Sequence, residues 1–186
     1  METVQLLING ISPILMHNPA AMGSTDNAAM KVKSIPTPED EAEASSYRLA
    51  DKQLYMPTEG FRLGILKKSV QGRKIGKRYA SSVVAGALFL INDRMPLFNP
   101  ANGREPVMDY EIDIRRVVIQ GAGIRRARPR VWPWGGVLDY EYDPDFIGRD
   151  VVLELQEIAG KLAGIGDYRP QKTGSFGRYS VEIVEH

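Results

Sequence analysis

The C-terminal stretch DVVLELQEIAGKLAGIGDYRPQKTGSFGRYSVEIV, residues 150–184, sets the order of elements from which the fold can be predicted. Its first part carries Val151, Leu155, Ile158 and Leu162 at 4-3-4 spacing, which predicts a helix with one apolar face. Its last part, FGRYSVEIVE, alternates apolar and polar residues and predicts a closing strand. The stretch therefore predicts a helix, a glycine-rich loop and a strand, in that order.

The loop between the two, residues 164–178 and here called the glycine loop, combines four glycines with basic and aromatic residues. Glycine lets a backbone approach other groups closely, so the loop packs tightly either on its own protein or on a ligand. The end of a helix accounts for Gly164 and Gly166. It does not account for Gly174 and Gly177. These two glycines indicate a loop that presents its backbone N–H groups to a sugar-phosphate chain. The candidate binding residues of the loop are Gly164, Gly166, Arg169, Lys172, Gly174, Phe176, Gly177 and Arg178.

The position of these glycines argues against a mononucleotide site. A dinucleotide fingerprint places its glycines between a strand and the helix that follows, whereas here they follow a helix. A Walker loop requires Gly-Lys-Ser/Thr, and KTGSFG has these letters in another order. No nucleotide cofactor is therefore expected.

Upstream of this stretch, the pattern predicts further strands and helices of one α+β domain. Residues 4–17 indicate a buried strand that bends at Gly10 and Pro13. Thr37 is placed to cap an acidic helix that runs to about Ala50, and Thr58 to cap a second helix. Further strands are expected at residues 83–93, 110–121 and 136–144.

Without the acidic helix and one inserted strand, this order is β-α-β-β-α-β. That is the ferredoxin-like (RRM-like) pattern, an antiparallel sheet with its helices on one face. We expect a single domain over residues 1–186, in which residues 18–57 are an insertion. The uncovered face of the sheet is then the expected path of a ligand.

Composition excludes several classes of function. The chain has no cysteine and only two histidines, so neither a thiolate metal site nor a His-rich one is expected. No apolar stretch approaches the roughly 18 residues that a membrane span needs. The N-terminus lacks the basic region of a signal peptide. We therefore expect a cytoplasmic protein without a metal or cofactor.

The net charge of +1 hides a strong segregation of charge. Thirteen of the 24 basic residues lie in two windows, residues 62–78 and 115–130, that contain no acid. The rest of the chain has 11 basic residues against 23 acidic ones. Such segregation predicts a basic surface for a polyanion. The candidate residues in and beside the first window are Lys67, Lys68, Arg73, Lys74, Lys77, Arg78 and Tyr79.

The segment IRRARPRVWPW, residues 124–134, joins arginines to tryptophans. Arginine forks bind phosphates and tryptophan faces stack on unpaired bases, so the segment favours single-stranded nucleic acid. The alternative is that the tryptophans fill the core while the arginines lie over the end of a hairpin. The candidates are Arg125, Arg126, Arg128, Arg130, Trp132 and Trp134.

Two segments together resemble the RAMP superfamily. They are GIGDYRPQKTGSFGRYSVEI (164–183), which follows a helix, and MPTEGFRLGILKKS (56–69). These are the repeat-associated proteins of CRISPR systems, whose backbone subunits polymerise along a guide RNA. The resemblance implies non-catalytic, largely sequence-independent coating of single-stranded RNA or DNA by head-to-tail assembly into an oligomer or filament. It also implies that residues 18–57 form a thumb. A stand-alone phage or prokaryotic protein that coats single strands is equally compatible.

The same resemblance implies an alternative, because RAMP endonucleases that process guide RNA often use a histidine near the first helix as general acid/base. His17 follows the first predicted strand, and a histidine with an ordinary pKa near 6.5 suits this work. Asp26 matches the thumb aspartate by which some RAMP backbones cut target RNA. A third possibility is that the basic windows bind an acidic protein partner.

Overall fold

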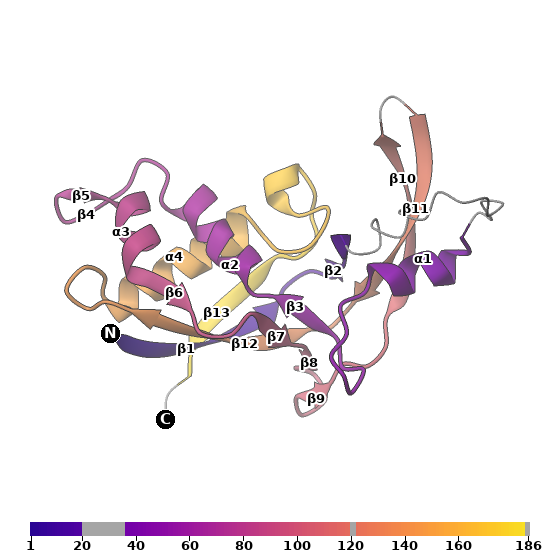
Figure 1. Cartoon of the computed structure of the whole chain (residues 1–186), viewed down its shortest axis with the longest axis horizontal. Helices are drawn as coiled ribbons and strands as arrows, with labels where there is room; N and C mark the ends of the chain where they lie inside the picture. Colours follow the sequence, from indigo (N-terminus) through magenta and orange to yellow (C-terminus); the bar gives the residue numbers. More distant parts are fainter. Residues whose placement is uncertain (20–35, 120–121, 185–186) are drawn as a thin grey trace, which may run out of the picture.

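The computed structural model describes residues 1–19, 36–119 and 122–184. In these residues it is an α+β fold with antiparallel sheets and four α-helices, extended along one axis (Figure 1). The α-helices are α1 (Pro38–Ser45), α2 (Glu59–Gly64), α3 (Ala80–Ala87) and α4 (Arg149–Leu162). A π-helical turn (Ile65–Ser69) continues α2, and a 3₁₀ turn (Pro170–Lys172) lies in the glycine loop.

The main sheet is antiparallel, and β1 lies between β13 and β12. The other edge of β12 pairs with β6 and, at Gly135, with β8, and β9 pairs with β8. Helices α2, α3 and α4 lie above this sheet in Figure 1 and cover one face of it. The strands are β1 (Glu2–Gly10), β6 (Leu88–Leu90), β8 (Phe98–Asn99), β9 (Glu105–Pro106), β12 (Gly135–Tyr142) and β13 (Tyr179–Ile183).

A second antiparallel sheet forms the other end of the molecule, with the order β10–β11–β2. Its long hairpin projects past the helices of the main body, and α1 packs beside β11 (Figure 1). The strands are β2 (Ile14–Leu15), β10 (Glu111–Ile119) and β11 (Ala122–Val131). Two small ladders complete the fold: β3 (Tyr55–Pro57) with β7 (Arg94–Pro96), and β4 (Lys74–Ile75) with β5 (Arg78–Tyr79).

Alternation along β12 decides which side chains enter the core, as the sequence predicts. Leu138, Tyr140 and Tyr142 are buried, whereas Asp139 and Glu141 lie on the other face and are partly exposed. A buried hydrogen-bond chain then ties β12 to the helix layer and to β13. The Tyr140 hydroxyl donates to Gln156 Oε1 (2.9 Å), and Gln156 Nε2 donates to the Tyr179 hydroxyl (2.6 Å). Burial raises the pKa of both tyrosines, so both keep their protons.

The apolar face of α4 differs from the predicted 4-3-4 stripe. The helix buries Val152, Leu155, Gln156, Ala159 and Gly160, while Leu162 is 55% exposed. Gly160 allows the helix to approach β13 closely, because an added Cβ there would overlap the Tyr179 carbonyl oxygen. Of the predicted stripe, Leu155 therefore lies on the buried face and Leu162 lies outside it.

Three other expectations are corrected by the structure. The segment predicted as a strand at residues 83–93 contains α3, whose buried residues recur at helical spacing (Ala80, Val83, Val84, Ala87), and the strand β6 follows it. Thr58 does not cap α2, because its hydroxyl donates to the Asn92 carbonyl (2.5 Å). Helix α1 starts at its predicted cap Thr37 but ends at Ser45 rather than near Ala50. Most of the predicted loop at residues 18–36, including Asp26, lies outside the described residues.

Candidate nucleic-acid interface

The close partner of the glycine loop is the link between β1 and β2. Gly177 N donates to the Pro13 carbonyl (2.7 Å), and Asp167 N donates to the Leu15 carbonyl (2.9 Å). Gly166 has a positive φ of 76°, and a Cβ there would meet the Leu15 carbonyl oxygen at 2.5 Å. The glycines at these positions therefore let two segments of the same chain pack without side chains between them.

The expectation that Gly174 and Gly177 present their N–H groups to a ligand is wrong. Gly174 N donates to the Arg169 carbonyl (3.1 Å), and Gly177 N is already bound to Pro13. An added Cβ at Gly174 would overlap the Tyr168 carbonyl, and one at Gly177 would overlap that of Ile165. Both glycines serve the internal packing of the loop, so its remaining candidates for binding are the side chains on its surface.

The β10–β11 hairpin is locked to this loop by Arg128. The Arg128 side chain is 10% exposed, its Nη2 lies 2.9 Å from Asp167 Oδ2, and its guanidinium lies over the Tyr168 ring (5.6 Å to the centroid). Arg115 of the same hairpin lies over Phe176, 4.5 Å from the ring centroid. Arg128 and Phe176 therefore join two parts of the protein, and neither is free to bind a strand.

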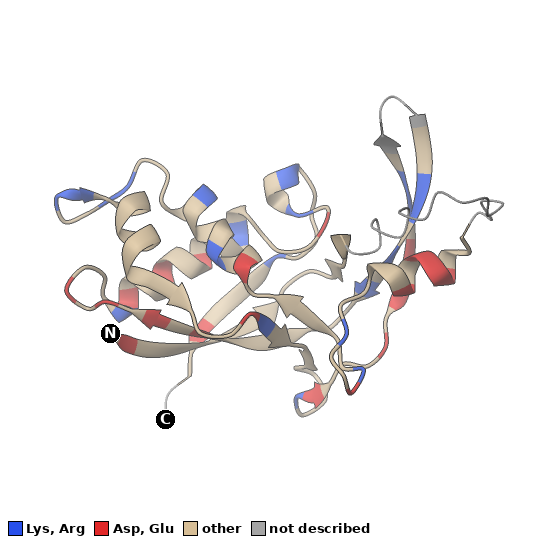
Figure 2. Ribbon diagram, in the orientation of Figure 1, with Lys and Arg blue, Asp and Glu red and all other residues tan. Residues whose placement is uncertain are grey.

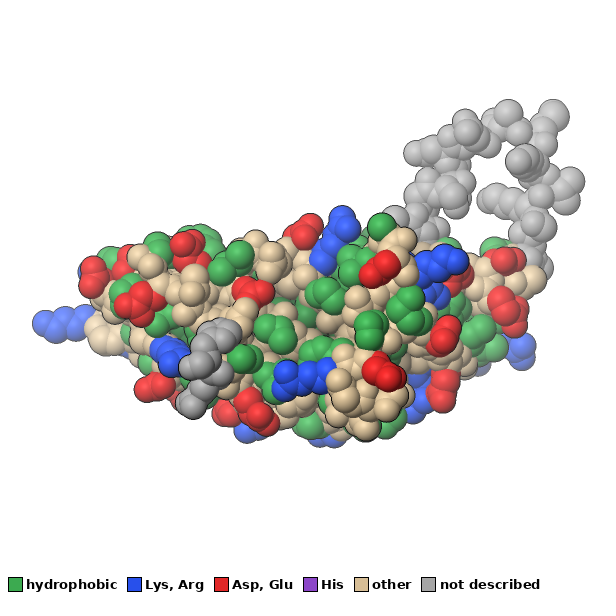
Figure 3. Space-filling view, turned by 90° about the horizontal axis from the view of Figure 1, so that it is seen from below, with side chains coloured by type: hydrophobic (Ala, Val, Ile, Leu, Met, Phe, Trp, Pro, Cys, Tyr) green, Lys and Arg blue, Asp and Glu red, His purple; other side chains and the backbone are tan. Residues whose placement is uncertain are grey.

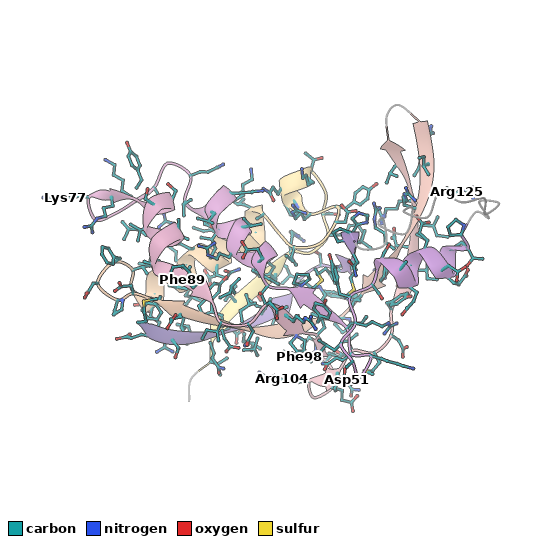
Figure 4. All side chains as sticks on the ribbon, in the orientation of Figure 1. Asp51, Lys77, Phe89, Phe98, Arg104 and Arg125 are labelled. Carbon is teal, nitrogen blue, oxygen red and sulfur yellow. The ribbon has the colours of Figure 1, made fainter. Side chains whose placement is uncertain are left out.

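Two more of the predicted arginines are also paired within the chain. Arg126 Nη1 lies 2.9 Å from Glu41 Oε1 of α1, and Arg130 pairs with Glu111 across the hairpin. Arg125 is exposed, and within the described part of the chain it forms no ion pair. Figure 4 shows it on the projecting part of the hairpin.

The two tryptophans have different surroundings. Trp134 is fully buried and its Nε1 donates to the Ser12 carbonyl (2.9 Å), so the prediction that it stacks on a base is wrong. Trp132 is 49% exposed. It lines a surface hollow together with Glu105, Asp109 and the paired Glu111 and Arg130, so acidic charge is in excess there and disfavours a polyanion.

The first basic window runs from α2 to the opposite end of the molecule. Arg73 is paired with Glu154 of α4 at 2.9 Å. The β4–β5 hairpin exposes Lys74, Lys77 and Tyr79, and the tyrosine ring is 68% exposed with the Lys74 ammonium 5.4 Å from its centroid. Figure 4 shows Lys77 at the tip of this hairpin, at the far end of the long axis from Arg125.

The segments that carry the unpaired cations lie on the helix side of the sheet. In Figure 2 the β4–β5 hairpin, the turn after α2, the glycine loop and the β10–β11 hairpin all lie above the sheet. Within the described residues, the exposed or partly exposed cations of these segments that form no ion pair are here called the cationic strip: Lys67, Lys68, Lys74, Lys77, Arg78, Arg116, Arg125, Arg169, Lys172 and Arg178.

The expected path over the uncovered sheet face is therefore corrected. That face presents Asp139, Glu141 and Glu182. Figure 3, which views the molecule from below, shows hydrophobic side chains near the centre of this side with acidic and basic ones among and around them. A polyanion is disfavoured there, and the helix side is the candidate interface.

A pocket of about 240 Å³ opens in this interface between α2 and the glycine loop, and it is here called the α2–loop pocket. Lys67 at the end of α2 and Arg169 in the loop line it together with His17. Arg169 is held by two hydrogen bonds, from Nη1 to the Gly166 carbonyl (2.8 Å) and from Nε to Gln171 Oε1 (3.1 Å). The pocket thus joins two cations and an imidazole around an otherwise largely apolar surface.

His17 reaches this pocket because its backbone is fixed by the segment after α1. The Tyr47 hydroxyl donates to the His17 carbonyl (2.9 Å), and Asn18 N donates to the Ser45 carbonyl (3.0 Å). Burial raises the pKa of Tyr47, so this hydroxyl stays a donor. The imidazole is partly buried and has no hydrogen-bond partner among the described residues.

Most of the residues that line the pocket were not predicted, among them Tyr47, Leu63 and Gln171. Gln171 lies two residues from Arg169, and its place in the glycine loop is a signal that would have found it. Leu63 is 37% exposed on α2. No local pattern marks Tyr47, which lies near the loop only in the folded chain.

Comparison with known proteins gives little more. No family model matches the chain, and no curated protein matches it. Among solved structures, it has a weak similarity to a Cas6 product complex, with a TM-score of 0.30 and 11% sequence identity. The match covers 96% of this chain and 50% of that one, so the chain spans half of the length of that Cas6 chain.

The described ranges contain neither a membrane-spanning helix nor a cluster of metal ligands. No helix there is long and apolar enough to cross a bilayer. Residues 1–19, 36–119 and 122–184 also contain no group of three or more His, Cys, Asp or Glu side chains arranged to hold a metal ion.

Proposed function

We propose that this protein binds single-stranded nucleic acid, RNA or DNA, largely independently of sequence and without covalent chemistry. One observation carries the proposal: the cationic strip extends over the helix side of the molecule, whereas the uncovered sheet face presents carboxylates. Cations without internal partners bind a sugar-phosphate chain without first breaking an ion pair. The binding residues we propose are those of the strip, with Tyr79 as an exposed ring on which a base stacks.

The strand order supports a ferredoxin-like description of the main body. Strands β13, β1, β12 and β6 are antiparallel neighbours in that order, and α2 and α4 lie on one face. In this description the body and the glycine loop form one RAMP-like domain. Residues 18–57 are an insertion in this description, and its helix α1 packs beside the β10–β11 hairpin.

Head-to-tail assembly follows from the extent of the strip. Lys77 and Arg125 lie toward opposite ends of the long axis (Figure 4). A nucleic-acid strand that follows the whole cationic strip leaves the subunit near one end of its long axis. A second copy in the same orientation can bind the next part of the strand there. A repeated contact of this kind does not close and forms a filament along the strand.

The proposal is tested by equilibrium binding of a labelled single-stranded oligonucleotide, as RNA and as DNA. The variant Lys67→Gln/Lys172→Gln removes two cations of the strip. The control Lys52→Gln/Arg104→Gln removes the same charge elsewhere, and Figure 4 shows Arg104 at the lower border of the molecule. We expect the first variant to bind roughly tenfold more weakly or worse and the control to bind nearly as the parent protein does. No binding by the parent protein at low salt would remove nucleic acid and leave an acidic protein partner.

A second candidate function, RNA cleavage, is favoured by the position of His17. Its imidazole has no hydrogen-bond partner among the described residues and shares the α2–loop pocket with Lys67 and Arg169. An imidazole can remove the proton of a 2′-hydroxyl, and the two cations can stabilise the charge that develops on the phosphate. Cleavage of RNA but not of its 2′-deoxy analogue, lost in His17→Ala while binding is retained, would replace the non-catalytic proposal. No cleavage by the parent protein would dismiss this candidate.

A further inference from the structure

We propose that the α2–loop pocket takes one nucleobase of the bound strand, turned out from its neighbours. The inference rests on the proposed function and adds to it a site that reads the base rather than the backbone. A strand held only through its phosphates needs no pocket, so the presence of one within the cationic strip calls for a ligand group of its own.

The size of the pocket suits a single planar group. Its volume is about 240 Å³, below the roughly 300–1,000 Å³ typical of sites for drug-sized ligands. The pocket is open on one side, so the sugar and phosphates of the same nucleotide can stay outside it. The size of the pocket therefore favours one base over a larger group.

The walls of the pocket are apolar on the side of α2 and its entry strand. Met56 and Pro57 of β3 line it, and Leu63 of α2 is 37% exposed there. Ile165 of the glycine loop adds to this apolar surface, and its Cδ1 packs closely against Gly60 of α2. A flat heteroaromatic ring gains apolar contact between such walls, whereas a free inorganic anion gains none.

The polar groups of the pocket suit the edge of a base. Gln171 Oε1 accepts from Arg169 Nε at 3.1 Å, and this bond leaves the Gln171 amide nitrogen without a partner among the described residues. The His17 imidazole is likewise without one in the described ranges. Amide and imidazole groups are donors and acceptors for the edges of unstacked bases.

The charges around the pocket suit the phosphates of the same nucleotide. Lys67 and Arg169 line it, and Asp167, the acid among its lining residues, is already paired with Arg128 at 2.9 Å. The uncompensated charge is therefore positive. The phosphates flanking the bound base would lie against these two cations.

The test compares two single-stranded oligonucleotides of equal length, one with its bases and one abasic throughout. The parent protein is expected to bind the base-containing strand at least about fivefold more tightly. Leu63→Ala and Gln171→Ala should each reduce this ratio severalfold while leaving the abasic strand bound as before. Leu162→Ala is the matched control, because Leu162 is an exposed helical leucine outside the pocket. Circular dichroism and thermal unfolding confirm that each variant is folded.

Each outcome bears on one of the two proposals. A ratio that both pocket variants leave unchanged would overturn the base pocket while the proposed function stands. A ratio near one in the parent protein would overturn both the base pocket and the stacking of a base on Tyr79, while binding of the strand through its phosphates stands. Failure of the parent protein to bind either strand would overturn the proposed function and the base pocket with it. A ratio that falls in the pocket variants but not in Leu162→Ala supports the base pocket.

Discussion

At the scale of single residues, the sequence marks the cations well and the aromatic residues poorly. Unpaired arginines and lysines were expected in the basic windows, and several are exposed without an ion pair among the described residues. Which cations are neutralised was not predictable, because the partners are distant in sequence. Arg126 pairs with Glu41, and Arg128 pairs with Asp167, so only folding brings each acid to its arginine.

The two tryptophans provide a prediction at this scale. Trp134→Ala should lower the free energy of unfolding by roughly 3–5 kcal/mol, because it empties a fully buried site and removes the hydrogen bond to Ser12. Trp132→Ala should change stability by less than about 1 kcal/mol and leave oligonucleotide affinity unchanged. Urea unfolding and a binding titration measure both effects. Weaker oligonucleotide binding by Trp132→Ala would show that this side chain belongs to the interface.

At the scale of elements, the glycine loop is where sequence and structure differ most instructively. Its position after a helix and its end-of-helix glycines were predicted, and Gly164 has the expected positive φ of 65°. The role of Gly174 and Gly177 was not predictable. A glycine indicates that another group approaches the backbone closely, but not whether that group belongs to a ligand or to the chain itself. The structure supplies the neighbour, which is the loop and the β1–β2 link.

Substitution of one loop glycine tests this packing. Gly174→Ala should lower the free energy of unfolding by roughly 1–3 kcal/mol, because its Cβ would overlap the Tyr168 carbonyl and force the backbone apart. Gly86→Ala is the control, since no atom lies within 4 Å of its added Cβ. Gly86 lies in the last turn of α3, so that change should leave stability unchanged or raise it by at most about 1 kcal/mol. Equal unfolding midpoints for the two variants would contradict the account of the loop.

The link between α1 and the second sheet provides a pH-dependent prediction. The hydrogen bond from Arg48 (2.7 Å) lowers the pKa of Glu43 below its ordinary 4.5, and one from the Tyr110 hydroxyl (2.7 Å) adds to this. Burial and the bond to Glu43 raise the pKa of Tyr110 to about 12, so it remains a donor at neutral pH. Because the pKa of Glu43 is lower in the folded protein than in the unfolded chain, the ionised carboxylate stabilises the fold at pH values above 4.5. This stabilisation is lost as the pH falls through the pKa of Glu43 in the folded protein.

The corresponding measurement is urea unfolding of the parent protein and Glu43→Gln over a range of pH. The parent protein should be the more stable at pH values above about 4.5, and the difference should shrink as the solution is acidified below it. Glu182→Gln, an exposed carboxylate without an ion pair in the described part of the chain, should show no such difference. A difference for Glu43→Gln that does not vary with pH would show that the carboxylate does not clamp α1.

At the scale of the whole molecule, the two basic windows come to lie on the helix side of the sheet, which also carries acidic residues of α2 and α4 (Figure 2). The basic windows are far apart in the chain, yet the segments that carry them lie on the same side. The α+β class and the alternation of β12 were predictable, because both follow from local periodicity. The side on which the cations gather was not, since it depends on how the β10–β11 hairpin docks on the glycine loop through Arg128 and Asp167.

The measurement that tests the central claim most directly is the salt dependence of oligonucleotide binding. If the cationic strip neutralises about six phosphates, the logarithm of the association constant should fall with the logarithm of salt concentration with a slope of about −4. Lys67→Gln/Lys172→Gln should make this slope shallower by about 1.4, and Lys52→Gln/Arg104→Gln should leave it unchanged. A slope near zero in the parent protein, or equal slopes for the two double variants, would contradict the account.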